Sequence, residues 1–303
     1  MKYPKTPLSN DQHIQLLRDR GLTILCENRA KKYLNSVGYF RLTGYMYHLQ
    51  TRDGNHSFVG EVNFDDIINL YQFDKKLRAV IIEYMERIEV AVKAKLTNKY
   101  SLRYGFFWYT QDALFIDKDI YYSINNEIAD TFANAQEGFL KSFKFNYRDE
   151  PSPPSNMALE TLTLGKLSRL YKGLDNNDEK IEIANEFNLV SSTLTSWLIY
   201  LTNVRNVCAH HSRLWNKKIT ADRPSIPSRK NYKFNGTMTD DFNTTMYGII
   251  SIMNRLLLSF NPDNRFISKI ENLIEEYSIQ TFLMGFPEDW KTEAHWHKEN
   301  NPK

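Results

Sequence analysis

Apolar residues recur at three- and four-residue steps over most of the chain, which is the spacing of one face of an α-helix. The longest such element runs from Asn63 to about Tyr100, with neither glycine nor proline inside it. Its apolar positions are Ile67, Leu70, Phe73, Leu77, Val80, Ile81, Tyr84, Ile88, Val92 and Leu96. At 1.5 Å per residue this helix would extend roughly 55 Å, and its apolar face needs partners along that whole length. We therefore predict that it is the spine of a helical bundle.

Shorter amphipathic segments flank this spine on both sides. Ser9 and Gln12 form a capping box, which is typical of a helix start, and Gly21 closes the helix that follows. Further helices are predicted over residues 27–36, 123–145, 156–173, 178–187, 191–214, 240–260 and 264–277. Strand-like alternation of apolar and polar residues is nearly absent. The predicted fold class is therefore all-α, a helical bundle with a long spine helix and additional N-terminal and C-terminal helices.

Charge is distributed unevenly along the chain, although the net charge is only +3. Residues 1–52 contain nine Lys/Arg against three Asp/Glu, and residues 205–233 contain eight against one, so these segments carry +6 and +7 and the remainder carries −10. Such polarisation is typical of basic surfaces that face a polyanion. The alternative is a solvated run of charges without a partner. We expect two regions, an N-terminal helical region rich in aromatic and basic residues (1–62) and a helical domain with a C-terminal helical extension (63–303).

The cysteines and the apolar runs indicate the compartment. Cys26 and Cys208 are the only two cysteines and lie far apart in sequence, which argues against a disulfide framework and favours a reducing environment. The first residues, MKYPKTPLSNDQ, contain no apolar segment, and no run of about 18 apolar residues occurs in the chain. We therefore expect a cytoplasmic protein with neither a signal peptide nor a membrane span.

The stretch NVRNVCAHHSRLWNKK, residues 203–218, is chemically the most informative part of the sequence. On a helix, Asn206, His210 and Arg213 would share one face at steps of four and three residues, and the long Arg205 side chain could reach the same patch. The opposite face carries the apolar residues Trp197, Leu201, Val204 and Cys208. This helix is therefore expected to present Arg, Asn, His and Arg together while its back packs into the core.

These residue types suit the cleavage of RNA without a metal ion. A neutral imidazole can deprotonate the 2′-OH, the nucleophile that RNA itself contains. A guanidinium can stabilise the charge that develops on the non-bridging phosphate oxygens, and Asn206 can hold either the imidazole tautomer or the phosphate. One histidine per chain supplies a base but no matching acid. A two-fold homodimer that brings two such faces together therefore makes better chemical sense.

Other chemistries fit the spacing of these residues less well. Cys208, His210 and His211 suggest zinc, but adjacent positions on a helix point apart and no further ligand follows at a suitable spacing. Cys208 falls on the apolar face, where a thiol is an inert core residue rather than a nucleophile. No glycine-rich phosphate loop is present that would indicate ATP or GTP chemistry. Neither a metal nor a cofactor is therefore expected.

Arg205 and Asn206, followed after three residues by His210, match the HEPN signature of Arg, a polar residue and a later His. The longer run RNVCAHHSRLWN resembles that of the Abi-like (abortive infection, AbiD/AbiF type) phage-resistance proteins of bacteria. Further segments stand in the order of that family, namely PLSNDQHIQLLRDRGL, VGYFRLTGYMY, FDDIINLYQFDKKLR, ERIEVAVKAKL, ALETLTLGKLSRLYKGL and MGFPEDW. They extend from Pro7 to Trp290, so the resemblance covers nearly the whole chain.

The resemblance implies a HEPN-type helical bundle, ribonuclease toxicity during phage infection of the toxin–antitoxin kind, and association with a small regulatory RNA. Enzymes of this kind cleave without metal, leave a 2′,3′-cyclic phosphate and a 5′-OH, and pair to form a composite site. Transferred by position, Arg205 and His210 are the catalytic pair and Asn206 is the supporting polar residue. Possible further supporting residues are His211, Arg213, Glu86, Arg87 and Glu89.

RNA contacts are expected from basic and aromatic residues in two parts of the chain. The candidates are Lys31, Lys32, Tyr39, Arg41, Tyr45, Lys217, Lys218, Arg223, Arg229, Lys230 and Lys233. In GYFRLTGYMY the aromatic rings could stack on unpaired bases; alternatively, they belong to the core and only Arg41 is exposed. Two other functions are consistent with the pattern, a non-catalytic RNA-binding module and a structural interaction protein. The latter explains a dimer surface but not the basic segment around the motif.

Overall fold

The computed structural model describes residues 6–227, 241–293 and 296, and the regular structure within them is helical. The prediction of an all-α fold is confirmed. The α-helices are α1 (Asn10–Asp19), α2 (Glu27–Ser36), α3 (Tyr39–Met46), α4 (Phe64–Tyr104), α5 (Lys118–Ala133), α6 (Gly138–Asn146), α7 (Ser155–Ala158), α8 (Leu164–Gly173), α9 (Asp178–Glu186), α10 (Ser191–Ala209), α11 (Met246–Phe260) and α12 (Phe266–Glu276). Three RNA-binding candidates lie outside the described residues: Arg229, Lys230 and Lys233.

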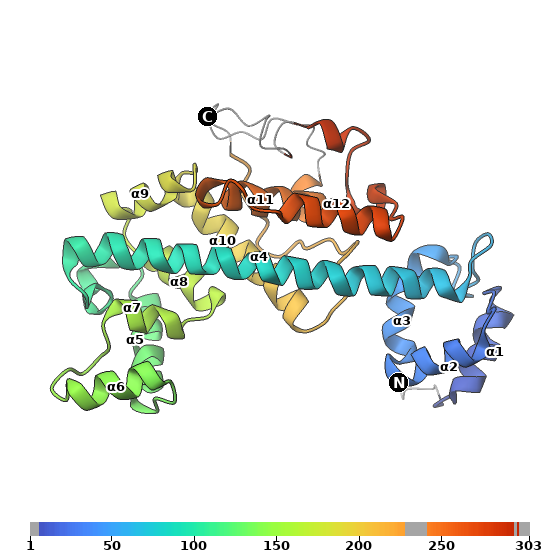
Figure 1. Cartoon of the computed structure of the whole chain (residues 1–303), viewed down its shortest axis with the longest axis horizontal. Helices are drawn as coiled ribbons and strands as arrows, with labels where there is room; N and C mark the ends of the chain where they lie inside the picture. Colours follow the sequence, from blue (N-terminus) through green and yellow to red (C-terminus); the bar gives the residue numbers. More distant parts are fainter. Residues whose placement is uncertain (1–5, 228–240, 294–295, 297–303) are drawn as a thin grey trace.

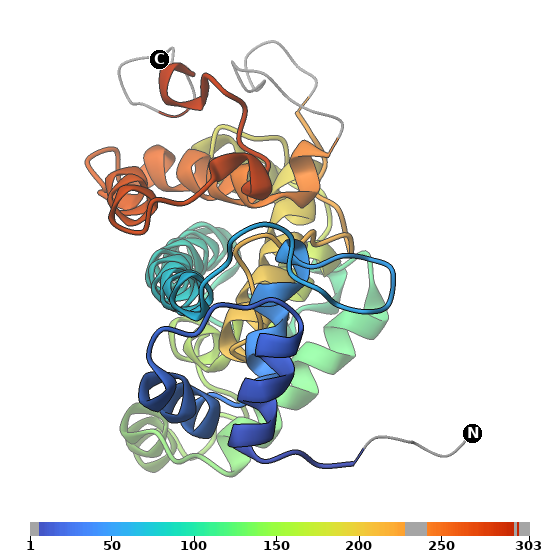
Figure 2. The ribbon, with the colours of Figure 1, turned by 90° about the vertical axis from the view of Figure 1, so that its right-hand side faces the viewer.

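Helix α4 is the spine that the apolar pattern predicts. It begins after Asn63, whose backbone N–H donates to the Asp66 carboxylate at 2.9 Å, and it ends at Gly105, where φ is +83°. Its 41 residues extend about 60 Å. In Figure 1 it crosses the molecule, with α11 and α12 above it and α1 to α3 at its N-terminal end. Figure 2, a view nearly along α4, shows other helices above, beside and below it, and its buried residues extend from Phe64 to Tyr100.

One contiguous apolar core joins both ends of the chain. Its buried residues extend in sequence from Ile14 in α1 to Trp296, and they come from α3, α4, α8, α10, α11 and α12 among others. Leu42 and Met46 of α3 belong to this same core. Buried residues of α1 to α3 thus belong to the same cluster as those of α4, and the division expected at residue 62 stays a prediction.

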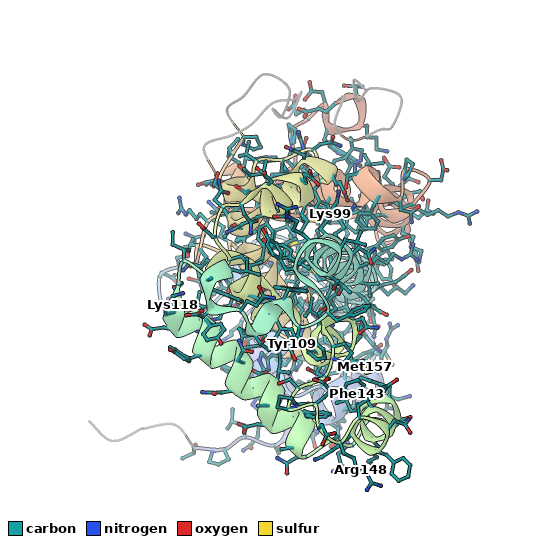
Figure 3. The ribbon with its side chains drawn as sticks, turned by 90° about the vertical axis from the view of Figure 1, so that its left-hand side faces the viewer. Lys99, Tyr109, Lys118, Phe143, Arg148 and Met157 are labelled. Carbon is teal, nitrogen blue, oxygen red and sulfur yellow. The ribbon has the colours of Figure 1, made fainter. Side chains whose placement is uncertain are left out.

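The helix predicted over residues 123–145 is in fact two helices, α5 and α6, with a break at 134–137. A second, small apolar cluster lies between them and is formed by Phe132, Leu140 and Phe143, with Met157 packed against it. Figure 3 looks onto this end of the molecule and shows Phe143 and Met157 close to each other. The α5–α6 hairpin thus has an apolar cluster of its own.

Two other predicted helices begin later or are divided. The segment 156–173 splits into α7 and α8, because the Thr163 hydroxyl accepts the Lys166 N–H and starts a new helix. The helix predicted from residue 240 begins at Met246. In both cases a threonine at the N-cap defines the start, which is the usual role of such a side chain. In the part of the chain that the structure describes, no helix is long and apolar enough to cross a membrane.

Candidate functional site

Helix α10 positions the Arg-Asn-His motif at its last turn. The face formed by Trp197, Leu201, Val204 and Cys208 is buried, as the sequence predicts, and the helix packs on α4 and α8. The indole N–H of Trp197 donates to the backbone oxygen of Ser225 at 2.8 Å, which ties the returning chain to the same helix. With its back fixed in this way, α10 turns its opposite face, from Asn203 to Ala209, toward the surface.

The helix ends at Ala209, five residues before the predicted end at Leu214. His211 adopts a left-handed conformation with φ of +54°, and its N–H donates to Cys208 O at 3.0 Å. The next N–H, of Ser212, donates to Val207 O at 3.0 Å. This pair of bonds is a Schellman helix ending, in which glycine is the usual left-handed residue. The prediction that residues 206, 210 and 213 share one helical face is therefore wrong, because the helix does not extend to residue 213.

Arg205, Asn206 and His210 nevertheless lie together. A guanidinium N–H of Arg205 donates to the Asn206 side-chain oxygen at 3.2 Å, and the His210 backbone N–H donates to Asn206 O at 3.0 Å. His210 is exposed at the helix end. Asn206 and His210 line a surface groove of about 360 Å³ together with Lys217 and Lys218. We call this the motif groove; it places an imidazole, an amide and two ammonium groups at one surface, with a guanidinium held beside them.

The loop that follows α10 is anchored on the spine by a buried carboxylate. Asp74 of α4 accepts the backbone N–H groups of Leu214 and Trp215 at 3.0 and 2.7 Å, and the Tyr45 hydroxyl at 2.6 Å. Arg78 forms an ion pair with the same carboxylate. Burial raises the pKa of Asp74, and Arg78, Tyr45 and the two backbone donors oppose that shift. A buried charge with this many donors fixes the loop rather than leaving it free.

Asp74 and Arg78 were not among the predicted site residues. Their signal in the sequence is a charged pair four residues apart that lies in register with the apolar positions Leu70, Leu77 and Ile81. Charged side chains on the buried face of a helix are rare unless they are paired. The buried ion pair in the segment FDKKLR could therefore have been recognised from the sequence. The two backbone N–H groups that Asp74 also binds, about 140 residues away, could not have been recognised in this way.

Helix α3 holds the same loop from its other side. A guanidinium N–H of Arg41 donates to the backbone oxygen of His211, and Arg213 returns a bond to the backbone oxygen of Gly44. Arg213 is thus engaged by α3 rather than presented beside His210, which corrects its expected position. The GYFRLTGYMY segment, whose role the sequence leaves open, is a support for the motif.

The sequence of this chain matches a known protein family. A model of the family described as Abi-like protein matches residues 32–216. The chain belongs to this Abi-like family. The match includes α3, α4 and α10 with its following loop, so it contains Asp74, Arg78 and the whole Arg-Asn-His motif. No curated protein and no solved structure matches the chain.

The N-terminal RNA-binding candidates of this Abi-like protein differ in exposure. Tyr45 is buried and hydrogen-bonded, so it offers no ring face to a base, and its predicted stacking role is corrected. Tyr39 accepts a hydrogen bond from Arg20 at 3.0 Å and is half-buried. Lys31 pairs with two carboxylates, of Asp11 at 2.6 Å and Glu27 at 3.0 Å. Of the basic candidates here, Lys32 and Arg41 are exposed.

The candidates on α4 contact other parts of the Abi-like bundle. Arg87 pairs with Glu83 at 3.2 Å, and Glu83 in turn binds Lys269 of α12 at 2.7 Å, so Arg87 lies toward α12. Glu89 pairs with the buried Lys93 at 3.0 Å, while Glu86 is exposed. The residues of α4 that touch the motif loop are instead Asp74 and Arg78. A role of Glu86, Arg87 and Glu89 beside the motif stays a prediction.

Cys208 lies on the buried face of α10, beneath the motif, and its thiol is unreactive there. Only 3% of its surface is exposed, and burial raises the pKa of its thiol to about 12. A thiol with that pKa is protonated at neutral pH and is a poor nucleophile. Within the described ranges, no three His, Cys, Asp or Glu side chains form a cluster that could hold a metal ion.

On the far side of the groove Lys218 pairs with Asp241, and Arg223 is exposed.

Proposed function

We propose that this Abi-like protein is a metal-independent endoribonuclease of the HEPN type. The observation that carries the proposal is the placement of His210. Its imidazole is exposed at the end of a rigidly packed helix, next to the bonded pair Arg205 and Asn206, and it lines a groove with two lysines. A base, a guanidinium and a cationic groove are the groups that cleavage of a ribose-phosphate linkage requires.

The chemistry follows from these groups. Neutral His210 takes the proton of a 2′-OH, and the 2′-oxygen forms a bond to the adjacent phosphorus. The bond from phosphorus to the 5′-oxygen breaks, which leaves a 2′,3′-cyclic phosphate and, once that oxygen takes up a proton, a 5′-OH. Arg205 stabilises the charge on the non-bridging oxygens, and Asn206 keeps the guanidinium in position. Lys217 and Lys218 attract the flanking phosphates.

The departing 5′-oxygen needs an acid, and the groove of one protomer has a single proposed base. We infer that a homodimer places the His210 imidazolium of a second protomer there. The exposure of His210 at a helix end is consistent with such a pairing. Membership of the Abi-like family supports a role in abortive infection, in which RNA cleavage stops phage growth and a small RNA restrains the toxin beforehand.

The test is cleavage of a fluorescently labelled single-stranded RNA by the purified chain. We expect cleavage in the presence of EDTA, no cleavage of the same sequence with 2′-deoxyriboses, and products with cyclic phosphate ends. His210→Ala and Arg205→Ala each lower the rate by about a hundredfold or more. The matched control is His56→Ala, because His56 is also exposed but lies in the loop before α4.

Three results would contradict the proposal: a requirement for a divalent metal, cleavage of the deoxyribose substrate, or full activity of His210→Ala. RNA that is bound tightly but never cut would indicate the alternative, a non-catalytic RNA-binding module. The dimer is tested separately by the mass of the protein in solution. It is tested further by adding an excess of inactive His210→Ala to the wild type, which lowers the activity if each site needs His210 from both protomers.

A further inference from the structure

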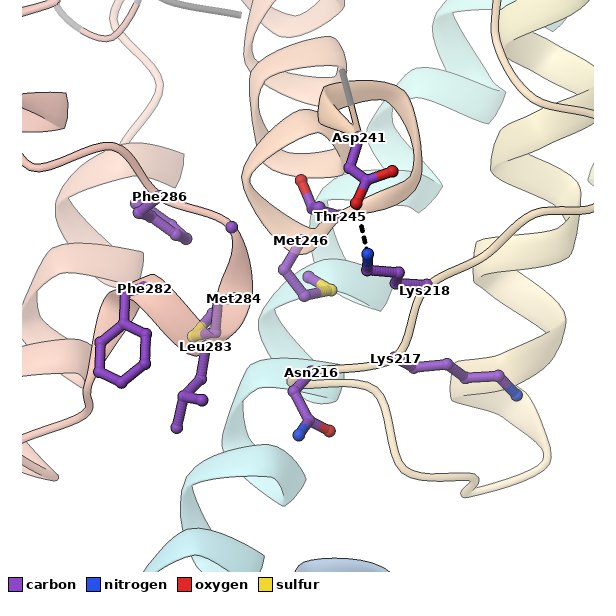
Figure 4. Close-up of a pocket in the computed structure, with 11 residues that line it drawn as sticks. Asn216, Lys217, Lys218, Asp241, Thr245, Met246, Phe282, Leu283, Met284 and Phe286 are labelled. Atoms are coloured by element: carbon purple, nitrogen blue, oxygen red, sulfur yellow. Dashed lines mark hydrogen bonds and ion pairs between the residues drawn. The ribbon is translucent and has the colours of Figure 1, made fainter. Parts of the chain in front are cut away.

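A second pocket lies next to the motif groove. Its volume is about 510 Å³, and it is bounded by Asn216 to Lys218, the start of α11, and the segment 282–286. Figure 4 shows Phe282 and Leu283 on one side and Asn216 and Lys218 on the other, with Met246 between them. Of these walls only Lys217 and Lys218 were predicted as site residues; the segment MGFPEDW was noted in the sequence only for its family resemblance.

The wall made by this segment is held rigidly. Gly285 has φ of +82°, and a Cβ on it would lie 2.5 Å from the Cβ of Thr245, so no larger residue fits between this turn and α11. The next residue, Phe286, packs against the rings of Tyr247 and Trp290, each with a centroid distance of 5.0 Å. The pocket is therefore a preformed feature with a fixed outer wall.

The lining of the pocket combines apolar surface with one unsatisfied polar atom. Met246 and Met284 are buried and form an apolar floor, whereas the Phe282 ring is 68% exposed at the rim. The side-chain oxygen of Asn216 is buried and accepts no hydrogen bond from the described residues. A buried acceptor without a donor is costly, and rotation of the half-buried Asn216 side chain toward the pocket would let a ligand N–H satisfy it. A flat heteroaromatic ring with an N–H edge has this chemistry.

The pocket and the motif groove share one wall. Lys217 and Lys218 line both cavities, and the adjacent Ile219 N–H donates to Thr244 O at 3.0 Å, which fixes this ridge against the turn before α11. In Figure 4 Lys218 reaches Asp241, while Lys217 extends away from Phe282 and Leu283. A polyanion lying in the motif groove would thus pass over Lys217 directly beside the pocket.

We propose that this pocket binds one unpaired nucleobase of a single-stranded RNA whose backbone lies in the motif groove. The base stacks on Phe282 and the two methionines and donates an N–H to Asn216, while its phosphate binds Lys217. Aromatic stacking of this kind holds single-stranded bases with little sequence preference, and a directed hydrogen bond adds selectivity. The inference rests on the proposed function in one respect, namely that RNA occupies the motif groove.

The test uses short RNAs in which every ribose is 2′-O-methylated, so that they cannot be cleaved, with a single fluorescent 2-aminopurine moved along the strand. We expect quenching at one position only with the wild type. Phe282→Ala removes that quenching and weakens binding about tenfold, which corresponds to about 1.4 kcal/mol. Asn216→Ala keeps the quenching and weakens binding of amino-bearing bases.

The matched control is Phe145→Ala, because Phe145 is 70% exposed on α6, outside this pocket; it is expected to bind like the wild type. Phe282 is similarly exposed, so its removal does not disturb the core. Quenching that is equal at all positions, or equal weakening by Phe282→Ala and Phe145→Ala, would overturn the inference. Because the probe has no 2′-OH, failure of cleavage with natural RNA would count against the proposed function alone.

Discussion

The side-chain oxygen of Asp74 accepts the backbone N–H of Trp215 at 2.7 Å, although 141 residues separate the two in the chain. The same carboxylate binds Arg78 and the Tyr45 hydroxyl. The loop after the motif helix is therefore shaped by contacts with α4 and α3 more than by its own sequence. Since His210 begins this loop, the geometry of the proposed catalytic base depends on an ionic group in the core.

Asp74→Ala is expected to lower the free energy of unfolding by about 3–5 kcal/mol, because it leaves Arg78 buried without its partner. Chemical denaturation measures this loss. In the double variant Asp74→Leu with Arg78→Met, both charges are gone, and the loss should be smaller than the sum of the single variants. Strict additivity of the single variants Asp74→Leu and Arg78→Met in this double variant would show that the two charges do not stabilise each other.

His211→Gly is expected to stabilise the protein by about 0.5–1 kcal/mol. His211 occupies the left-handed position of a Schellman ending, where a Cβ is unfavourable and glycine is not. Thermal unfolding at fixed pH measures the gain, and the control is His210→Gly, since φ of −82° at His210 gives glycine no advantage. A His211→Gly variant that is more stable but no longer cuts RNA would assign His211 to the chemistry.

Asn206→Ala is expected to lower kcat about tenfold to a hundredfold with little change in KM. The side-chain oxygen of Asn206 holds the Arg205 guanidinium at 3.2 Å, and a positioning group acts mainly in the transition state. Steady-state cleavage kinetics separate the two parameters, with Asn134→Ala as a control on an exposed asparagine at the end of α5. A rise in KM alone would instead make Asn206 a contact to bound RNA.

Acidification is expected to weaken the fold through His48. Burial, assisted by the nearby Arg213 charge, lowers the pKa of His48 below its ordinary 6.5. Below pH 6.5 the unfolded chain therefore binds a proton more readily than the folded one, and the free energy of unfolding decreases as the pH falls toward the folded pKa. His48→Gln should flatten this decrease below about pH 6.5. An unchanged slope in His48→Gln would contradict the assignment.

The two cysteines should differ sharply in reactivity. Cys26 is exposed, whereas Cys208 is buried and its pKa is raised to about 12. A thiol reagent at neutral pH should modify only Cys26 in the folded protein and both residues after denaturation. Rapid labelling of both thiols in the folded protein would show that the back of α10 opens, and Cys26→Ser identifies which thiol reacts.

The helical frame could be predicted because its signals are local. The spine contains no breaker between Asn63 and Tyr100 and its apolar positions keep a constant period, so its existence and nearly its full length follow from the pattern. The helix predicted over residues 27–36 has the bounds of α2. Ser9 and Gln12 form the predicted capping box.

The site required information that is not local. The end of α10 at Ala209 was missed because a histidine, rather than glycine, takes the left-handed position. Tyr45 was expected to be available to RNA because its neighbours are basic, but composition does not tell which side of the short helix α3 faces the spine. The pocket beside the groove joins residue 216 to residues 282–286, and only packing brings these segments together.

The two arginine bonds that cross between α3 and the motif loop run in opposite directions, each from a guanidinium to a main-chain oxygen of the other segment. Because both bonds end on main-chain oxygens, they break when α3 and the motif loop move apart, and a ligand that fills the groove does not break them. A ligand that separates α3 from this loop would therefore inactivate the proposed nuclease without resembling its substrate.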